Sequence, residues 1–86
     1  MNIEVFVYPN PVRIDTANIR ILNTKEPAIV SIYNISGQLV LQENLPSSVN
    51  YFRDFRFDTT RFSSGMYFAI VDINGRRYRD NFAIVR

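Results

Sequence analysis

The chain has 86 residues, of which 47% are hydrophobic and 14% aromatic, and its formal net charge is +2. That length holds one hydrophobic core, and the composition is too apolar for a disordered chain. Cysteine and histidine are both absent, which excludes a disulfide framework and argues against a zinc site. We therefore expect residues 1–86 to form a single domain with no cofactor.

Ten basic and eight acidic residues are interspersed along the chain. We interpret the one local basic cluster, which contains Arg76, Arg77 and Arg79, as the solvated arm of a hairpin, so nucleic acid is not an expected partner. No run approaches the ~18 apolar residues of a transmembrane helix. The first residues lack the basic and apolar regions of a signal peptide. The chain is then either not secreted by the usual route or is a piece cut from a longer precursor.

Period-two alternation dominates the chain, and no window shows a helical stripe. Turn residues separate the alternating segments at intervals typical of an antiparallel sandwich. The expected strands are 3–8, 17–23, 28–34, 38–44, 51–57, 66–72 and 76–85. We therefore predict an Ig-like seven-stranded antiparallel β-sandwich with no helix longer than one turn.

Strand parity predicts which side chains face the core. Ser31 and Tyr33 are expected to face away from it. The residues expected to point inward are Ile19, Ile21, Val30, Ile32, Val40, Tyr51, Phe55, Phe57, Tyr67, Ala69, Val71, Tyr78, Phe82 and Ile84. Outward parity also falls on Leu39, Leu41, Phe68 and Ile70, which would form an apolar docking patch if their strands are neighbours.

Segment 62–75 has the pattern of a tyrosine corner. A large apolar residue and Gly65 precede an alternating strand whose second residue after the glycine is Tyr67. In Ig-like sandwiches such a tyrosine packs inward, and its hydroxyl bonds to the backbone a few residues upstream. Asn74 and Gly75 then tolerate the positive φ angles of a type I′ hairpin turn. Gly65, Tyr67, Asn74 and Gly75 are thus predicted to be structural residues.

Two further turns interrupt the strands. Pro9 and Pro11 remove backbone donors on either side of Asn10, so strand pairing must break there. Gly37 supplies the positive φ of the hairpin turn in segment 34–37. Both turns have backbone explanations, and the first could also serve as a recognition tag at a domain boundary.

No catalytic residues are predicted. Asp58 is the one carboxylate inside a patterned motif, but acid–base catalysis would need a positioned partner, and Asp54 has the opposite strand parity from Phe55 and Phe57. We interpret Asp58 as a turn or cap residue that accepts backbone N–H bonds. Ser36, Ser63 and Ser64 have no base to activate them.

Five motifs in order, covering residues 7–86, resemble the type A C-terminal sorting domain of the Por (type IX) secretion system of Bacteroidetes. They are Val7-Tyr8-Pro9-Asn10-Pro11, the hairpin 30–40, the crossover 57–62, Gly65-Met66-Tyr67-Phe68 and the closing segment 81–86. A related Ig-like domain of flagellar hook-capping proteins usually carries a tryptophan before its Gly-x-Tyr strand. This chain has no tryptophan, which favours the sorting domain.

The resemblance implies a non-catalytic delivery module on the C-terminal side of a covalently attached cargo. Its implied partners are the outer-membrane translocon and a sortase-like peptidase, and its implied route runs through the periplasm to the cell surface or the extracellular space. Candidate recognition residues are Tyr8, Pro9, Asn10, Pro11, Gly37, Phe82 and Arg86. The last strand, 76–86, is expected to keep a free edge for pairing with another chain.

Two alternatives remain. The domain could be a passive Ig-like spacer or scaffold of a secreted enzyme. It could also be a carbohydrate-binding module, although only Tyr33, Phe52 and Phe68 have outward parity, and three scattered aromatics are normal on a protein surface. Carbohydrate is therefore the less favoured partner.

Overall fold

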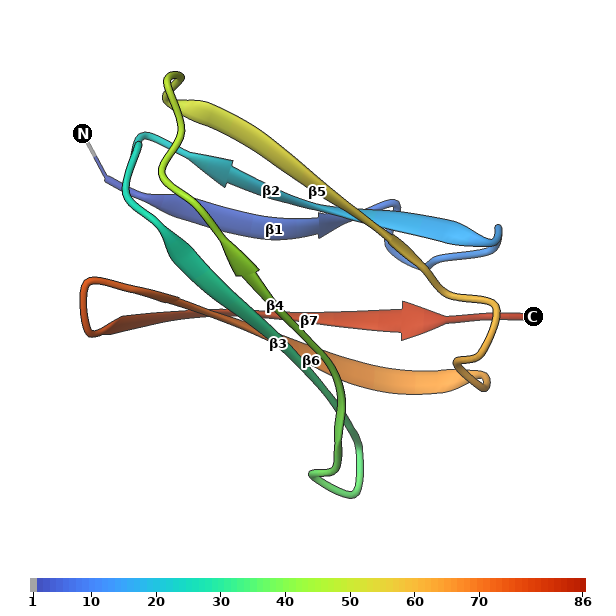
Figure 1. The fold of residues 1–86 in the computed structure, drawn as a ribbon. Helices are drawn as coiled ribbons and strands as arrows, with labels where there is room; N and C mark the ends of the chain where they lie inside the picture. Colours follow the sequence, from blue (N-terminus) through green and yellow to red (C-terminus); the bar gives the residue numbers. More distant parts are fainter. Residues whose placement is uncertain (1) are drawn as a thin grey trace.

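The computed structural model describes residues 2–86, which form two antiparallel β-sheets packed face to face (Figure 1). The predicted sandwich is confirmed, and the described residues contain no helix. Residues 2–86 therefore contain no helical segment that could span a membrane. The strands are β1 (Glu4–Tyr8), β2 (Thr16–Leu22), β3 (Ala28–Asn34), β4 (Leu39–Leu45), β5 (Phe52–Asp58), β6 (Gly65–Ile73) and β7 (Arg76–Ile84).

The small sheet has the strand order β1-β2-β5, and the large sheet has the order β4-β3-β6-β7. The two layers are separate in Figure 1, with the small sheet above and the large sheet below. β4 pairs with β3 and so extends the large sheet, in the position that strand C′ takes in variable-type Ig domains. β4 and β7 are therefore the two edges of the large sheet.

The core lies between the sheets, and its members come from every strand except β4. β2 and β6 each bury alternate residues, because one face of each strand meets the opposite sheet. The buried hydrophobic residues are Val7, Val12, Ala17, Ile19, Ile21, Ala28, Val30, Ile32, Phe57, Tyr67, Ala69, Val71, Ile73, Phe82 and Ile84. Phe55, Leu41, Leu45 and Tyr78 are partly buried against them.

The inward position predicted for Val40 is wrong. The pairing of β3 with β4 shifts register between Ile32 and Tyr33, so Ile32 lies opposite Leu41 while Tyr33 lies opposite Leu39. Val40 is the additional residue of this bulge and is exposed. Leu41, which was expected to face outward, packs against the core instead. An added residue reverses strand parity, and the local alternation gives no sign of it.

Tyr51 was also expected in the core, and this too is wrong. β5 begins one residue later, at Phe52, and Tyr51 is 62% exposed in the preceding loop. The Lys25 ammonium lies 4.6 Å from the centre of its ring. The loop backbone is held by a hydrogen bond from the Asn23 amide to the Tyr51 carbonyl.

The turn predictions agree with the backbone. Asn74 and Gly75 have φ angles of 52° and 79°, both in the positive range that a type I′ turn requires. This turn joins β6 to β7. Gly37, at the tip of the β3–β4 hairpin, has a φ angle of 82°.

Candidate functional site at the terminal strand

Residues 9–12 cross from the small sheet to the outer edge of β7. The Val12 amide donates to the Ala83 carbonyl at 2.7 Å, and the Val85 amide donates to the Val12 carbonyl at 2.8 Å, which forms a parallel bridge. Asn10 extends this pairing with its side chain, which accepts from the Ala83 amide at 3.1 Å and donates to the Asn81 carbonyl at 3.1 Å. The Pro-Asn-Pro segment therefore closes the second half of the β7 edge.

The prediction of a free edge along the whole of 76–86 is thus wrong for its second half. The prolines end the pairing of β1 with β2. Asn10 and Val12 then form hydrogen bonds with the outward backbone groups of β7. The sequence pattern predicts the break but not the new partner, because Val12 is a single valine outside any strand pattern. The first half of β7 keeps outward-directed backbone groups without a partner among the described residues.

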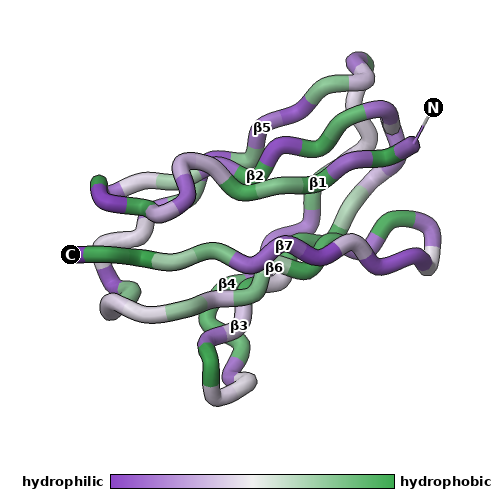
Figure 2. Tube along the Cα trace, turned by 180° about the vertical axis from the view of Figure 1, so that it is seen from behind, coloured by the Kyte–Doolittle hydropathy of each residue, from purple (hydrophilic) through white to green (hydrophobic). Residues whose placement is uncertain are grey.

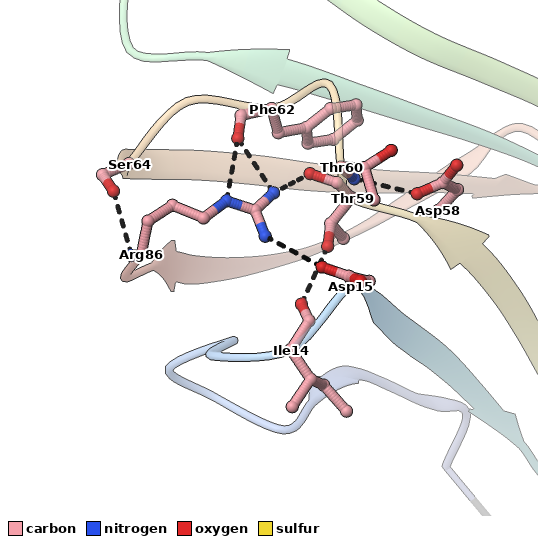
Figure 3. Close-up of polar contacts among 8 residues, drawn as sticks. All are labelled: Ile14, Asp15, Asp58, Thr59, Thr60, Phe62, Ser64 and Arg86. Carbon is pink, nitrogen blue, oxygen red and sulfur yellow. Dashed lines mark hydrogen bonds and ion pairs between the residues drawn. The ribbon is translucent and has the colours of Figure 1, made fainter.

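Arg86 holds the loop of residues 59–64, which we call the crossover loop (Figure 3). Its Nε and Nη2 atoms donate to the Phe62 carbonyl at 3.3 and 3.0 Å, and Nη2 also donates to the Thr59 carbonyl. Its backbone amide donates to Ser64 Oγ at 3.0 Å. Nη1 lies 3.9 Å from the Asp15 carboxylate. One guanidinium group therefore ties the end of β7 to the loop that joins the two sheets.

The crossover loop is also held from the small-sheet side. Thr59 is fully buried, its Oγ1 donates to the Ile14 carbonyl at 3.0 Å, and its amide donates to the Asp15 carbonyl at 2.8 Å. The Asp58 carboxylate accepts from the Thr60 amide at 2.8 Å, which is the cap role predicted for it. The hydrogen bond from the Thr60 backbone is the main reason that the pKa of Asp58 lies below its usual range.

Tyr67 supports the crossover loop by a hydrogen bond and by packing of its ring. Its side chain is 5% exposed, and its hydroxyl donates to the Ser63 carbonyl at 2.7 Å, so the predicted hydrogen bond of the tyrosine corner is present. The ring lies between Phe62 at 5.3 Å and Phe82 at 5.6 Å, measured between ring centroids. Gly65, with a φ angle of 152°, starts β6 just before it.

Replacing Tyr67 by phenylalanine should lower the free energy of unfolding by about 1–2 kcal/mol, because the Ser63 carbonyl loses its donor. Urea denaturation followed by tyrosine fluorescence would measure the change. Tyr33→Phe, a change on the outer face of the large sheet, is the matched control and should be close to neutral. A Tyr67→Phe variant as stable as the parent chain would contradict a stabilising role of this hydrogen bond.

The remaining predicted recognition residues do not form one site. Pro9, Asn10 and Pro11 are exposed beside β7, whereas Gly37 is exposed at a hairpin tip in the β3–β4 connection. Phe82 has no exposed surface and belongs to the core. Any part that Phe82 plays in recognition must therefore act through the shape of the domain.

Tyr8 belongs to a polar cluster on the outer face of the small sheet that the sequence pattern did not predict. The Arg20 guanidinium donates to both carboxylate oxygens of Asp54 at 2.9 Å, and the Tyr8 hydroxyl donates to the same carboxylate at 2.6 Å. Arg20 also lies over the Tyr8 and Phe52 rings, 4.7 and 4.5 Å from their centres. Parity alone places these residues on one face, but only the register of β1, β2 and β5 makes them neighbours.

The cluster should make stability depend on pH. The hydrogen bonds from Arg20, together with those from Tyr8, hold the pKa of Asp54 below its usual range. The unfolded chain then binds more protons than the folded one just below about pH 4, so stability should fall as the pH drops through that range. Asp54→Asn should reduce the loss of melting temperature between about pH 7 and about pH 3. Glu43→Gln, at an exposed position of β4, is the control and should keep the full loss.

The outward aromatic residues lie on two opposite faces. Phe52 is on the small sheet, whereas Tyr33 and Phe68 are directly paired on the large sheet. They cannot form one flat sugar-binding platform. Leu39 is paired with Tyr33 as well, and Ile70 is paired with Ser31, so three of the four predicted patch residues share the large sheet's outer face. Leu41 is the exception, for the reason given above.

The Asp58 carboxylate accepts from the neighbouring backbone, and residues 2–86 place no acid–base pair around it. Within residues 2–86, no group of three or more His, Cys, Asp or Glu side chains is placed to hold a metal ion. The site is built from backbone hydrogen bonds, one guanidinium group and a closed sheet edge. Such an arrangement defines an Ig-like module whose terminal strand is joined to both sheets.

Comparison with known proteins identifies the kind of module. The family model described as the secretion system C-terminal sorting domain matches residues 6–85. The chain belongs to this family and is a type IX secretion sorting domain. A comparison with curated protein sequences gave no match.

Two solved structures are similar. PorZ of Porphyromonas gingivalis, described as an essential bacterial surface component of the type IX secretion system, is 26% identical with a TM-score of 0.70. The match covers 95% of this chain and 11% of PorZ, so the chain spans about one ninth of that protein's length. CHIR-AB1 is 16% identical with a TM-score of 0.57, over 99% of this chain and 97% of that one, and supports the fold alone.

Proposed function

We propose that this chain acts as a single module that delivers a cargo joined to its N-terminal side through the outer membrane. The cargo would cross the periplasm first, and a sortase-like peptidase would then remove the module at the cell surface. The family match over residues 6–85 is the observation that carries the proposal. A machine that exports folded cargo needs a folded signal, and this domain presents a folded sandwich.

Within this proposal, recognition falls on the residues around the closed end of β7 and on the separate hairpin turn at Gly37. Tyr8, Pro9, Asn10 and Pro11 lead into this end, and Arg86 holds it to the crossover loop. Phe82 contributes through the shape of the core, and Gly37 through the exposed turn of its hairpin. The crossover loop and the β6–β7 turn keep their backbone geometry through four structural residues, which are Gly65, Tyr67, Asn74 and Gly75. The module itself would perform no catalysis, since its serines have no neighbouring base.

Export of a fused reporter tests the proposal. A reporter with its own signal peptide is joined to this chain and expressed in a host with a working type IX system. The fusion is expected to reach the surface, whereas the reporter alone should stay in the periplasm. The same fusion in a host without a type IX translocon should also stay in the periplasm. Surface labelling and cell fractionation measure the three outcomes.

The same experiment distinguishes a sorting module from a passive spacer. A spacer has no export signal, so the fusion would remain in the periplasm of the competent host. That result would contradict the proposed function, provided that the fused domain is folded. Resistance of the periplasmic domain to limited proteolysis checks this condition.

A further inference from the structure

The first half of β7 has free hydrogen-bonding groups. In an antiparallel ladder, the amide and carbonyl of every second residue point to the same edge. Ala83 and Val85 use their outward groups to bind Asn10 and Val12, so the outward groups at the start of the strand belong to Arg77 and Arg79. No hydrogen bond from the described residues reaches these four groups. We call them the open edge.

The open edge is short and has a defined end. At Asp80 the chain turns its side chain to the small sheet, where the carboxylate accepts from the Val7 amide at 2.8 Å. From Asn81 onward, Asn10 and Val12 occupy the edge. A strand that joined β7 here would therefore form its hydrogen bonds with Arg77 and Arg79.

The side chains of the open edge itself are basic. Figure 2 shows the beginning of β7 in the hydrophilic colour next to the β6–β7 turn, and Arg76, Arg77 and Arg79 account for three basic residues there. Arg77 forms a solvent-exposed ion pair with Asp72 at 3.2 Å. Arg79 lies over the Phe68 ring, 4.6 Å from its centre, and binds Asn81 rather than a carboxylate.

The other sheet edges carry different chemistry, and the β1 sequence contains Glu4 and no basic residue. The β4 sequence contains Glu43 and no basic residue, and β4 pairs irregularly with β3 where it begins. The β5 sequence alternates basic and acidic residues, so its edge has no single sign. Among the four edge strands, the start of β7 alone combines free backbone groups with basic side chains and no acidic one.

We propose that the open edge binds an extended acidic peptide segment, which adds to the large sheet as a strand beside β7. Residues of the segment opposite Arg77 and Arg79 would exchange backbone hydrogen bonds with them. Their side chains would lie on the same face as the two guanidinium groups, because cross-strand partners share a face. The segment therefore carries carboxylates at positions i and i+2, with an apolar residue between them that faces Tyr78.

A depression next to the open edge suits such a segment. It has a volume of about 270 Å³ and is lined by Tyr33, Gly37, Phe68, Ile70, Arg77 and Arg79. The aliphatic parts of two glutamate side chains can cover its apolar wall while their carboxylates reach the arginines. Strand addition of this kind takes its affinity from the main chain and its specificity from alternate side chains.

The inference rests on the proposed function only for where the partner would occur, namely in the export machinery or in a cargo. Binding itself is a property of the isolated chain. It is tested by titrating the ¹⁵N-labelled chain with the capped peptide Thr-Glu-Val-Glu-Thr to millimolar concentration. Amide shifts are expected at Arg77 and Arg79 and at their neighbours on β6.

Two protein variants and two altered peptides make the test specific. Arg79→Glu should weaken binding about tenfold, since it replaces an attraction by a repulsion. Arg56→Glu, at an exposed position of β5, is the matched control and should bind as the parent chain does. A peptide with lysine in place of both glutamates should not bind. A peptide that is N-methylated at both glutamates should also fail, because it cannot donate to the Arg77 and Arg79 carbonyls.

Several outcomes would overturn the inference. They are the absence of shifts at the highest concentration, shifts centred outside β7, and equal binding of the N-methylated peptide, which would mean attraction by charge alone. Export of the fused reporter without peptide binding would overturn this inference and leave the proposed function standing. Peptide binding without export would leave this inference standing and overturn the proposed function.

Discussion

Replacing Phe82 by alanine is expected to lower the free energy of unfolding by about 3–5 kcal/mol, which is the usual cost of removing a large aromatic side chain from a packed core. Phe82 has no exposed surface, and its ring contacts Phe57 of the small sheet as well as Tyr67 of the large one. It therefore joins the last strand to both layers.

A domain of 86 residues has a free energy of unfolding of about 4–13 kcal/mol. The Phe82→Ala variant should consequently lose a large share of its free energy of unfolding and unfold at a lower urea concentration. Urea denaturation followed by circular dichroism would show this. Phe52→Ala is the control: Phe52 is 49% exposed beneath Arg20, and its removal should cost less than about 1 kcal/mol. Equal losses for the two variants would mean that β7 is not part of the core.

This result bears on how export is studied. Deleting residues 82–86 would remove Phe82 and Ile84, both of which are buried, together with Arg86. The deletion would therefore unfold the domain, and loss of export would not identify a recognition sequence. Substitutions at exposed positions, such as Arg79→Glu, separate recognition from folding.

Replacing Arg86 by alanine should lower the free energy of unfolding by about 1.5 kcal/mol, the lower end of the range for hydrogen bonds to a charged group, because the side chain is partly exposed. The change removes the donors of the Thr59 and Phe62 carbonyls. Chemical denaturation measures the difference in stability. Hydrogen exchange of the amides in the crossover loop should also accelerate, since the loop loses one of its supports.

Two comparisons test the geometry of the Arg86 contacts. Arg86→Lys should restore only a small part of the stability, because a single ammonium group cannot reproduce the planar set of guanidinium donors. Arg61→Ala, an exposed change in the same loop, should be close to neutral. Full rescue by lysine would mean that charge alone matters at this position.

Arg86 and Tyr67 should also be energetically coupled. Both donate to carbonyls of the crossover loop, Arg86 to Phe62 and Tyr67 to Ser63. If loss of either contact loosens the loop, the double variant should lose less stability than the two single losses added together. Additive losses would show that the two ends of the loop respond independently.

The chain is a type IX sorting domain and is similar to a part of PorZ that makes up about one ninth of that protein. β7 carries both the closed end, which lies beside Pro9–Pro11, and the open edge at Arg77 and Arg79. A partner that binds the open edge would therefore contact the large sheet next to the Pro-Asn-Pro segment.

The sequence by itself determined the strands, the turns and the tyrosine corner, because each depends on residues close together in the chain. Alternating apolar residues define a strand with one buried face, and Asn74-Gly75 defines a turn through the φ angles that these residues tolerate. Tyr67 needed only a position relative to Gly65 for its hydroxyl to reach Ser63.

The tertiary structure decided everything that depends on register or on pairing between distant segments. The bulge between β3 and β4 exchanged Val40 for Leu41 at the core, since one added residue reverses parity without altering composition. Val12 closed half of the β7 edge from more than 70 positions away, as the separation of 73 between Asn10 and Ala83 illustrates. Arg86 found its carbonyl partners in the same way, because backbone groups left unpaired by a loop accept any donor that the fold brings within reach.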